Sequence, residues 1–222
     1  MGYTEHKMED RMDGIIFDVD GTIWDATDTI LEGFNEGVLS YLNEDYLITR
    51  KQLQSVFGKT MEELFAILFP TLSKEEQIRI GKLCMEHEDR KLKMKGGNLY
   101  TGMRELIQTL KQQYNIYIVS NCQLGYIETM LEFTGLGSYI TDFLCYGETL
   151  QPKSFTIREI MRRNNLENVV YIGDTLGDQN ACIEAGVPFI YVTYGFGEGV
   201  EAEMSVDEPL QILELIKQLE CK

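Results

Sequence analysis

The feature of this sequence that most constrains its fold is a set of short, mainly apolar runs that alternate with segments of helical pattern. Runs of this length and composition, bounded by polar or turn-forming residues, are typical of buried strands. They occupy residues 14–17, 115–119, 143–145, 169–172 and 189–192. Helical patterns lie at 103–113, 125–133, 154–165, 177–185 and 209–219. Strands that alternate with helices predict a doubly wound, Rossmann-like α/β core built on a parallel sheet.

A long stretch without a convincing strand separates the first predicted strand from the others. From about residue 27 to 95 the apolar residues recur at helical spacing. A Ser or Thr followed three positions later by Glu or Gln marks the start of a helix. This pattern occurs at Thr49, Thr60 and Ser73. We therefore predict an all-helical cap domain at residues 25–96, inserted into a core formed by residues 1–24 and 97–222.

The formal net charge of −16 limits the partners of this chain. A surface this acidic repels nucleic acid and anionic lipid, which leaves small molecules or proteins as partners. No apolar run is long enough to cross a bilayer, and the charged residues 1–13 predict no signal peptide. We expect no nucleic-acid or membrane partner, and the sequence leaves the oligomeric state open.

The cysteines and histidines narrow the chemistry further. The five cysteines are scattered, odd in number and form no Cys-x-x-Cys pair, so a disulfide framework or a zinc site is not expected. This usage favours a reducing, cytoplasmic location. The two histidines, His6 and His87, are too few for a multi-histidine metal site. Catalysis therefore has to rest on carboxylates, hydroxyl groups and lysine.

One acidic turn holds the first candidate catalytic residues. The segment 18–22, with the sequence Asp-Val-Asp-Gly-Thr, directly follows the first apolar run. A carboxylate is able to attack phosphorus, and a second group must give a proton to the leaving oxygen and later take one from water. Asp18 and Asp20 suit these two roles, and Thr22 offers a hydroxyl and an N–H to phosphate oxygens. A plain solvated turn is the alternative, but the preceding strand and Thr22 favour the catalytic interpretation.

Two later segments add groups that bind phosphate. Ser120 and Asn121 close the second predicted strand, where a hydroxyl or an amide is placed to hold a phosphate oxygen. Lys153 directly precedes a predicted helix for which Ser154 is the expected N-cap, and its ammonium group is suited to neutralise both Asp18 and a phosphate. Taken singly, Ser120 is better explained as an ordinary turn residue and Lys153 as a surface lysine.

The segment 173–178 (Gly-Asp-Thr-Leu-Gly-Asp) supplies two more carboxylates between a buried strand and a helix. Hard oxygen ligands of this type suit Mg²⁺, which binds a few carboxylates together with water and phosphate. Capping of the helix by Asp174 or Asp178 is the structural alternative, and the two roles are compatible. We predict that Asp174 and Asp178 belong to a Mg²⁺ site.

Taken together, these segments resemble the haloacid dehalogenase superfamily of phosphohydrolases. The match runs in order along residues 14–192: the Asp-Val-Asp-Gly-Thr segment, then Ser120, Lys153 and Asp174 with Asp178. The helical insert resembles the C1-type cap of phosphoglycolate phosphatase-like members. The resemblance implies a Mg²⁺-dependent phosphatase that hydrolyses a small phosphorylated metabolite through an aspartyl-phosphate intermediate.

The resemblance also implies a role for each matched residue. The first aspartate of the family motif is the nucleophile and the second is the general acid/base, which here are Asp18 and Asp20. Ser120 and Lys153 correspond to the residues that bind the phosphoryl group. The implied Mg²⁺ ligands are Asp18, the backbone carbonyl of Asp20, and Asp174, with Asp178 supporting the site directly or through water.

Two alternatives remain beside the phosphatase. Sugar phosphomutases such as β-phosphoglucomutase resemble this chain in layout, but they carry a histidine in the first cap helix, and the region near Ile30 has none. A catalytically silent, phosphate-sensing module on the same fold is the other alternative. The intact set of Asp18, Asp20, Lys153 and Asp174 argues against it.

Three further features have plain structural interpretations. The glycines Gly195, Gly197 and Gly199 predict a turn rather than a dinucleotide site, because no helix signal follows them. Trp24 is expected to pack near the cap boundary. Lys59 is expected to be a surface lysine. Its position in a predicted cap loop also makes it a candidate for contact with the substrate.

Overall fold

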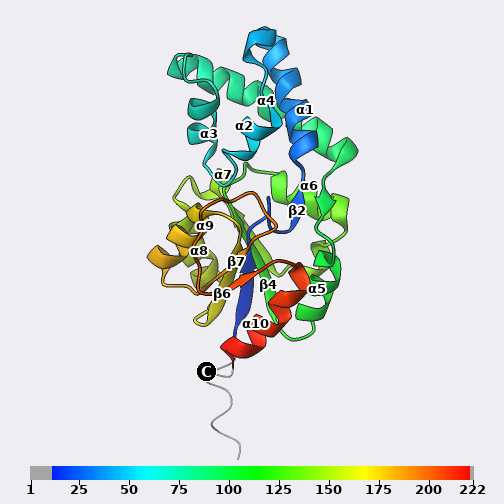
Figure 1. Ribbon diagram of the computed structural model, residues 1–222, viewed down its shortest axis with the longest axis vertical. Coiled ribbons are helices and arrows are strands. Elements are labelled where there is room, and N and C mark those ends of the chain that lie inside the picture. Colours follow the sequence, from blue (N-terminus) through cyan, green and yellow to red (C-terminus); the bar gives the residue numbers. More distant parts are fainter. Residues whose placement is uncertain (1–11, 221–222) are drawn as a thin grey trace, which may run out of the picture.

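The structure, a computed structural model, describes residues 12–220 (Figure 1). At its centre is a six-stranded sheet in the order β5-β4-β1-β6-β7-β8, in which every neighbouring pair is parallel. The strands are β1 (Gly14–Phe17), β4 (Asn115–Ser120), β5 (Asp142–Cys145), β6 (Val169–Gly173), β7 (Phe189–Val192) and β8 (Ser205–Val206). This sheet confirms the predicted doubly wound α/β architecture. The predictions for residues 1–11 and for Cys221 lie outside the described residues.

Helices cover both faces of the sheet (Figure 1). The helices on one face are α8 (Lys153–Asn164) and α9 (Leu176–Ala185), and those on the other are α5 (Met103–Leu110), α6 (Tyr126–Thr134) and α10 (Ile212–Leu219). Successive residues of β1 alternate between the two cores: Ile16 packs with α8 and α9, whereas Ile15 and Phe17 pack on the opposite side. Because both faces are buried, the strands have to be apolar throughout, which explains the uninterrupted runs in the sequence.

The predicted insert forms four helices beyond the carboxyl ends of the strands, at the top of Figure 1. They are α1 (Thr27–Tyr41), α2 (Arg50–Gln54), α3 (Met61–Leu68) and α4 (Lys74–Lys95). All three predicted capping boxes are present, with Thr49, Thr60 and Ser73 as the N-caps of α2, α3 and α4. A small antiparallel pair that the sequence did not indicate, β2 (Trp24–Asp25) with β3 (Asn98–Leu99), joins the chain segments entering and leaving this helical part.

Two glycines allow α1 and α4 to pack closely together. A Cβ atom at Gly33 would lie 2.6 Å from Cα of Glu88, and one at Gly37 would lie 2.7 Å from Cα of Cys84. Any larger residue at either position would therefore push the helices apart. The contact fixes the face of α4 that carries Cys84 and Glu88 against α1, toward the interior.

Several element boundaries differ from the predictions. Helix α8 begins at Lys153, so Ser154 lies inside its first turn and is not the N-cap; the extended backbone of Pro152 (φ −54°, ψ 151°) lets helical geometry start one residue earlier. The helix predicted at 103–113 ends at Leu110, and the closing helix begins with a 3₁₀ turn. The remaining short elements are η1 (Glu44–Tyr46), η2 (Gly137–Tyr139), α7 (Tyr146–Thr149) and η3 (Pro209–Gln211).

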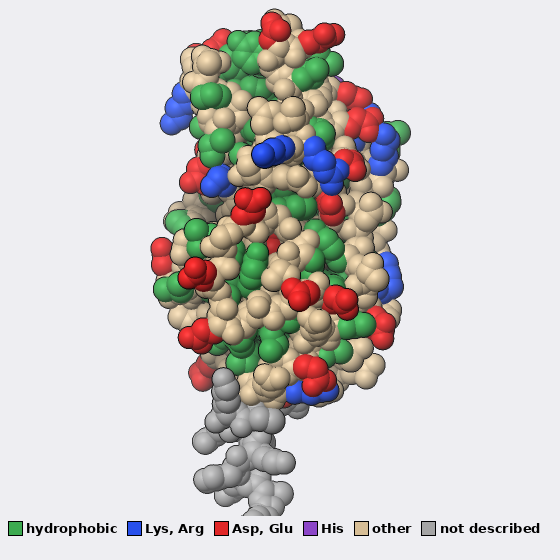
Figure 2. Space-filling model, in the orientation of Figure 1, with side chains coloured by type: hydrophobic (Ala, Val, Ile, Leu, Met, Phe, Trp, Pro, Cys, Tyr) green, Lys and Arg blue, Asp and Glu red, His purple; other side chains and the backbone are tan. Residues whose placement is uncertain are grey.

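The charged side chains on the surface agree with the formal net charge of −16. On the face shown in Figure 2, acidic side chains are spread over both the helical part and the sheet part, and no continuous basic surface is visible. None of the described helices combines the length and the apolarity needed to span a bilayer.

Candidate active site

The strand order β4-β1-β6 places the carboxyl ends of three predicted strands side by side. Phe17 at the end of β1 is in register with Ile118 of β4 and Ile172 of β6. A polar residue stands at or just beyond each of these ends, and all three are buried: Asp18, Ser120 and Asp174. The sheet therefore gathers them at one edge, as the sequence predicted.

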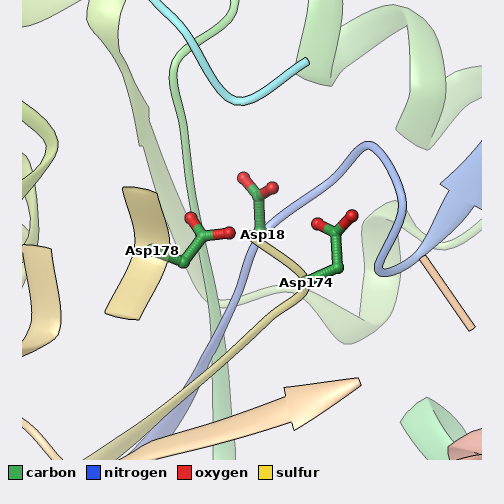
Figure 3. Close-up of side chains that lie close together, drawn as sticks. All are labelled: Asp18, Asp174 and Asp178. Carbon is green, nitrogen blue, oxygen red and sulfur yellow. The ribbon is translucent and has the colours of Figure 1, made fainter. Parts of the chain in front are cut away.

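Three buried carboxyl groups form a cluster at this edge. Figure 3 shows Asp18, Asp174 and Asp178 close together, and one oxygen of each lies within 4.8 Å of the others. Burial raises the pKa of Asp18 to about 6, although Lys153 partly offsets it. Burial, together with the charges of Asp178 and Asp18, raises the pKa of Asp174 well above its usual range. A buried set of oxygen donors with excess negative charge fits a divalent cation such as Mg²⁺.

Lys153 is the buried cation of this cluster. Its ammonium group donates to Asp18 Oδ1 at 3.0 Å and to Asp178 Oδ1 at 2.5 Å. Burial lowers the pKa of Lys153, but Asp178 and Asp18 outweigh that effect, so the pKa is raised and the side chain stays charged. The lysine lies in the position that the sequence predicted, beside the first aspartate of the acidic turn.

Asp178 is tied into the start of α9. Thr175 is the N-cap: its hydroxyl accepts from the backbone N–H of Asp178 at 3.1 Å, and Asp178 Oδ2 accepts from the backbone N–H of Thr175 at 2.9 Å. The predicted capping role therefore belongs to Thr175, with Asp178 completing the capping box and Asp174 outside it. Both Asp178 oxygens accept hydrogen bonds within the protein, Oδ1 from Lys153 and Oδ2 from Thr175, which fixes this carboxylate beside Asp18 and Asp174.

Asp174 is held by two loops that pack closely around it. Its Oδ2 accepts from the backbone N–H of Phe196 at 2.7 Å, and its Oδ1 accepts from the Thr22 hydroxyl at 3.4 Å. A Cβ atom at Gly21 (φ 81°) or at Gly195 would lie within 2.3 Å of the Asp174 side chain. The glycine-rich segment is thus a turn that orients a carboxylate. The Thr22 side chain is fully buried against Asp174, a place suited to positioning that carboxylate.

Asp20 lies in the same turn as Asp18 but in a different environment. Its Oδ1 accepts from the Tyr126 hydroxyl at 2.5 Å and from the Trp24 indole N–H at 3.1 Å. Burial raises the pKa of Asp20 to about 7, and the hydrogen bonds from Tyr126 and Trp24 oppose this rise. A carboxyl group that titrates near neutral pH is suited to give and take a proton.

The part of the sequence that forms these strand ends also matches a known protein family. Residues 15–192 match the family described as haloacid dehalogenase-like hydrolase. The chain belongs to this family. The predicted enzyme family is therefore confirmed. Two curated relatives of this haloacid dehalogenase-like hydrolase are a pyrophosphatase PpaX of Listeria welshimeri and a phosphoglycolate phosphatase of Vibrio vulnificus. The first is 23% identical and covers 81% of this chain and 80% of its own; the second is 22% identical and covers 92% and 93%.

Solved structures show the same fold. A haloacid dehalogenase-like family protein from Streptococcus pneumoniae superposes with a TM-score of 0.81 at 20% identity, covering 94% of this chain and 99% of its own. A predicted phosphoglycolate phosphatase from Haemophilus somnus gives a TM-score of 0.81 at 18% identity, with the same coverage. At this identity the likeness establishes the architecture of this hydrolase.

A small cavity of about 40 Å³ lies over Asp18 and Asp20. Its lower wall comes from the carboxyl end of the sheet and includes Ser120 and Asn121. Its upper wall comes from α1 to α4 and is mainly apolar, with Ile30, Phe34, Leu53, Val56 and Leu64. The volume suffices for only a few water molecules.

The remaining candidate site residues of this hydrolase lie where the two walls of the cavity meet: Ser120, Asn121 and Lys59. Ser120 is buried in the cavity lining, and Asn121 donates through Nδ2 to the backbone oxygen of Gly58 at 2.8 Å, in the loop between α2 and α3. Lys59 in the same loop lines the cavity with an exposed side chain. Phe57 beside it stacks on Phe196, with ring centroids 4.7 Å apart.

Three residues at the site were not singled out from the sequence. Tyr126 binds Asp20, and Gln123 donates to Glu88, which projects from α4 into the cavity lining. One signal was available for Glu88: it stands four residues from both Cys84 and Leu92, so a charged residue occupies the inner stripe of α4. Tyr126 and Gln123 carry no such signal, because their partners lie far away in the sequence.

Proposed function

We propose that this chain is a Mg²⁺-dependent phosphatase that hydrolyses a small phosphorylated metabolite through an aspartyl-phosphate intermediate. The observation that carries the proposal is the contrast between the two aspartates of one turn. Asp18 lies in the carboxylate cluster beside Lys153, whereas Tyr126 and Trp24 bind Asp20 outside that cluster. One carboxylate is thus suited to attack and the other to proton transfer. The names of the relatives, which include two kinds of phosphatase, support the same reaction class.

The reaction has two displacement steps at phosphorus. A carboxylate oxygen of Asp18 attacks the phosphorus atom, the ester P–O bond breaks, and protonated Asp20 gives its proton to the leaving oxygen. Asp20, now a carboxylate, then takes a proton from a water molecule that attacks the aspartyl phosphate. The bond between phosphorus and Asp18 breaks, inorganic phosphate leaves, and both aspartates return to their starting forms. Lys153 and Ser120 are suited to bind the phosphoryl oxygens.

The residues present fit a Mg²⁺ ion. The carboxylates of Asp18 and Asp174 and the backbone carbonyl of Asp20 would hold it, with Asp178 as support. When bound, the ion supplies positive charge that lets a carboxylate and an anionic phosphate approach each other. Since Lys153 is the only cation that contacts the three clustered carboxylates in the described part of the chain, the cluster carries excess negative charge without a metal.

We also propose that residues 25–96 act as a cap that opens and closes over the core. The narrow cavity of about 40 Å³ between the two walls supports a closed form as one of the two states. The β2–β3 pair lies where the cap joins the core, and the Asn121–Gly58 and Phe57–Phe196 contacts hold the walls together.

The four described cysteines are buried and free, which supports the proposed cytoplasmic location.

Hydrolysis is favoured over phosphoryl transfer between sugar positions. Ile30 of α1 lines the cavity in the region where the related mutases carry a histidine. An isoleucine side chain neither gives nor takes a proton. Transfer from a sugar bisphosphate without release of inorganic phosphate would be the signature of the mutase.

The test is the release of nitrophenolate from p-nitrophenyl phosphate by the purified protein with added Mg²⁺. We expect the Asp18→Asn variant to lose activity by at least about a thousand-fold, because the nucleophile is gone. Asp45→Asn, an equal charge change at an exposed position of the helical part, serves as the control and is expected to retain full activity. Equal rates for the wild type and Asp18→Asn would refute the proposal.

A further inference from the structure

Glu88 is a buried acid that the proposed reaction does not use. It lies on α4 with 3% of its surface exposed, whereas Glu86 on the same helix is exposed. Acidic side chains are rarely buried to this extent unless they are paired. Burial, with further contributions from Asp20 and Asp89, raises the pKa of Glu88 well above its usual range. A side chain kept here at an energetic cost calls for a specific interaction.

The protein satisfies only part of this carboxyl group. In the described part of the chain, the one hydrogen bond to the Glu88 side chain comes from Gln123 Nε2, which lies 3.0 Å from Oε2. Oε1 receives no hydrogen bond from the described residues, and the side chain lines the cavity. Oε1 is therefore free to accept a hydrogen bond from a donor group on a molecule bound in the cavity.

Glu88 differs in polarity from the cap residues around it in the cavity lining. The cap residues around it in the cavity are mainly apolar, so on this side Glu88 is the principal hydrogen-bond acceptor. The core side carries Asp18 and Asp20, and the basic side chain of the lining is Lys59, which is exposed at the loop. A substrate with its phosphate at Asp18 would therefore extend its organic part toward Glu88.

We infer that Glu88, positioned by Gln123, is a specificity residue that accepts a hydrogen bond from a hydroxyl or ammonium group on the organic part of the substrate. The inference rests on the proposed phosphatase function and names its substrate class: small phosphate monoesters that carry a hydrogen-bond donor close to the phosphate. A carboxylate in the same place has no proton to donate to Glu88. The subsite therefore disfavours phosphoglycolate, although some relatives are named for that substrate.

The test uses four two-carbon phosphate esters that differ only at the far end. They are 2-hydroxyethyl phosphate, phosphoethanolamine, ethyl phosphate and phosphoglycolate. We measure kcat/KM for each, and also its inhibition constant against p-nitrophenyl phosphate, so that slow turnover does not hide a binding preference. We expect at least one of the two donor esters to exceed ethyl phosphate by about 10-fold or more and phosphoglycolate to rank last. The ranking of hydroxyl against ammonium identifies which donor the subsite prefers.

The Glu88→Leu variant, which removes the acceptor at similar size, separates specificity from structure. We expect it to lose about 10-fold on the preferred donor ester while ethyl phosphate and p-nitrophenyl phosphate change by less than about 3-fold. Glu86→Leu, the matched exposed control on the same helix, leaves all four values unchanged. A loss of equal size on every ester would make Glu88 a structural contact between α4 and the core and overturn the inference.

Two other results would also overturn it. Phosphoglycolate that binds and reacts as well as 2-hydroxyethyl phosphate would show that the subsite accepts a carboxylate. If the protein hydrolyses neither the four esters nor p-nitrophenyl phosphate, the proposed function fails and this inference fails with it. Hydrolysis of p-nitrophenyl phosphate without any ranking among the esters overturns the inference alone.

Discussion

The two walls of the cavity are built from different chemistry. The core wall carries Asp18 and Asp20 just beyond a strand end, fixed by hydrogen bonds from Lys153 and from Tyr126 respectively, and beside this wall Asp174 is held by the backbone N–H of Phe196. The cap wall is made of apolar side chains on helices, with Glu88 as its buried acid. The difference suggests a division of labour, in which the core performs the reaction and the cap selects the molecule that reacts. Substitutions in the two walls should therefore impair different properties of the protein.

The largest effect is expected in the core wall, from Asp20→Asn. An amide cannot carry the proton, so kcat for alkyl phosphates should fall by about 10²- to 10⁴-fold. The Mg²⁺ concentration for half-maximal rate should stay nearly constant, because the Asp20 side chain lies outside the carboxylate cluster. Titration of the rate with Mg²⁺ checks both statements. A large loss of metal affinity would instead assign the Asp20 carboxylate to the metal.

Asp174→Asn should act on the carboxylate cluster beside this wall and fail in another way. Removing one charge from the buried cluster should raise the half-maximal Mg²⁺ concentration by about 10- to 100-fold, with a smaller loss of rate at saturating metal. The comparison with Asp20→Asn distinguishes a metal ligand from a proton carrier within one site. An unchanged Mg²⁺ dependence would remove Asp174 from the metal site.

In the cap wall, Gly37→Ala should cost stability rather than chemistry. The added methyl group meets the backbone of α4 at Cys84, and overpacking of this kind costs about 1–3 kcal/mol. The unfolding temperature should fall by several degrees in a calorimetric scan, while the pH dependence of the rate is preserved. Gly137→Ala is the matched control, because nothing lies within 4 Å of its added Cβ. Equal stability of the two variants would show that α1 and α4 tolerate separation.

The smallest effect is expected from Tyr126→Phe. Its hydroxyl stabilises the ionised form of Asp20 and so lowers the pKa of that carboxyl, which burial has raised to about 7. Without the hydroxyl the pKa rises further, so Asp20 stays protonated to higher pH. The alkaline limb of kcat/KM should therefore move up by about half a pH unit or more, as a pH–rate profile will show. A downward shift would contradict the assignment of Asp20 as the acid.

The core wall was largely predictable from the sequence, and the cap wall was not. Strand ends converge at one edge of a parallel sheet by geometry, so Asp18, Ser120 and Asp174 fall together once the strands are located. The interactions of Tyr126 and Gln123 depend on how α6 faces the acidic turn and α4, which no local pattern encodes. The two-residue strands β2, β3 and β8 are too short to leave a periodic signal. Serine is a residue type typical of an N-cap, but at Ser154 the helix has already begun, because the backbone of Pro152 starts it one residue earlier.

The most direct test of the central claim is to trap the phosphorylated enzyme. Asp20→Asn is mixed with p-nitrophenyl phosphate and Mg²⁺, quenched in acid and mapped by peptide mass spectrometry. Nitrophenolate leaves without a proton, so the first step should proceed, whereas the second lacks its base and the intermediate should accumulate. We predict a burst of nitrophenolate and one phosphoryl group on the peptide that contains Asp18. A burst with the phosphoryl group on another residue, or no burst and no modified peptide, would contradict it.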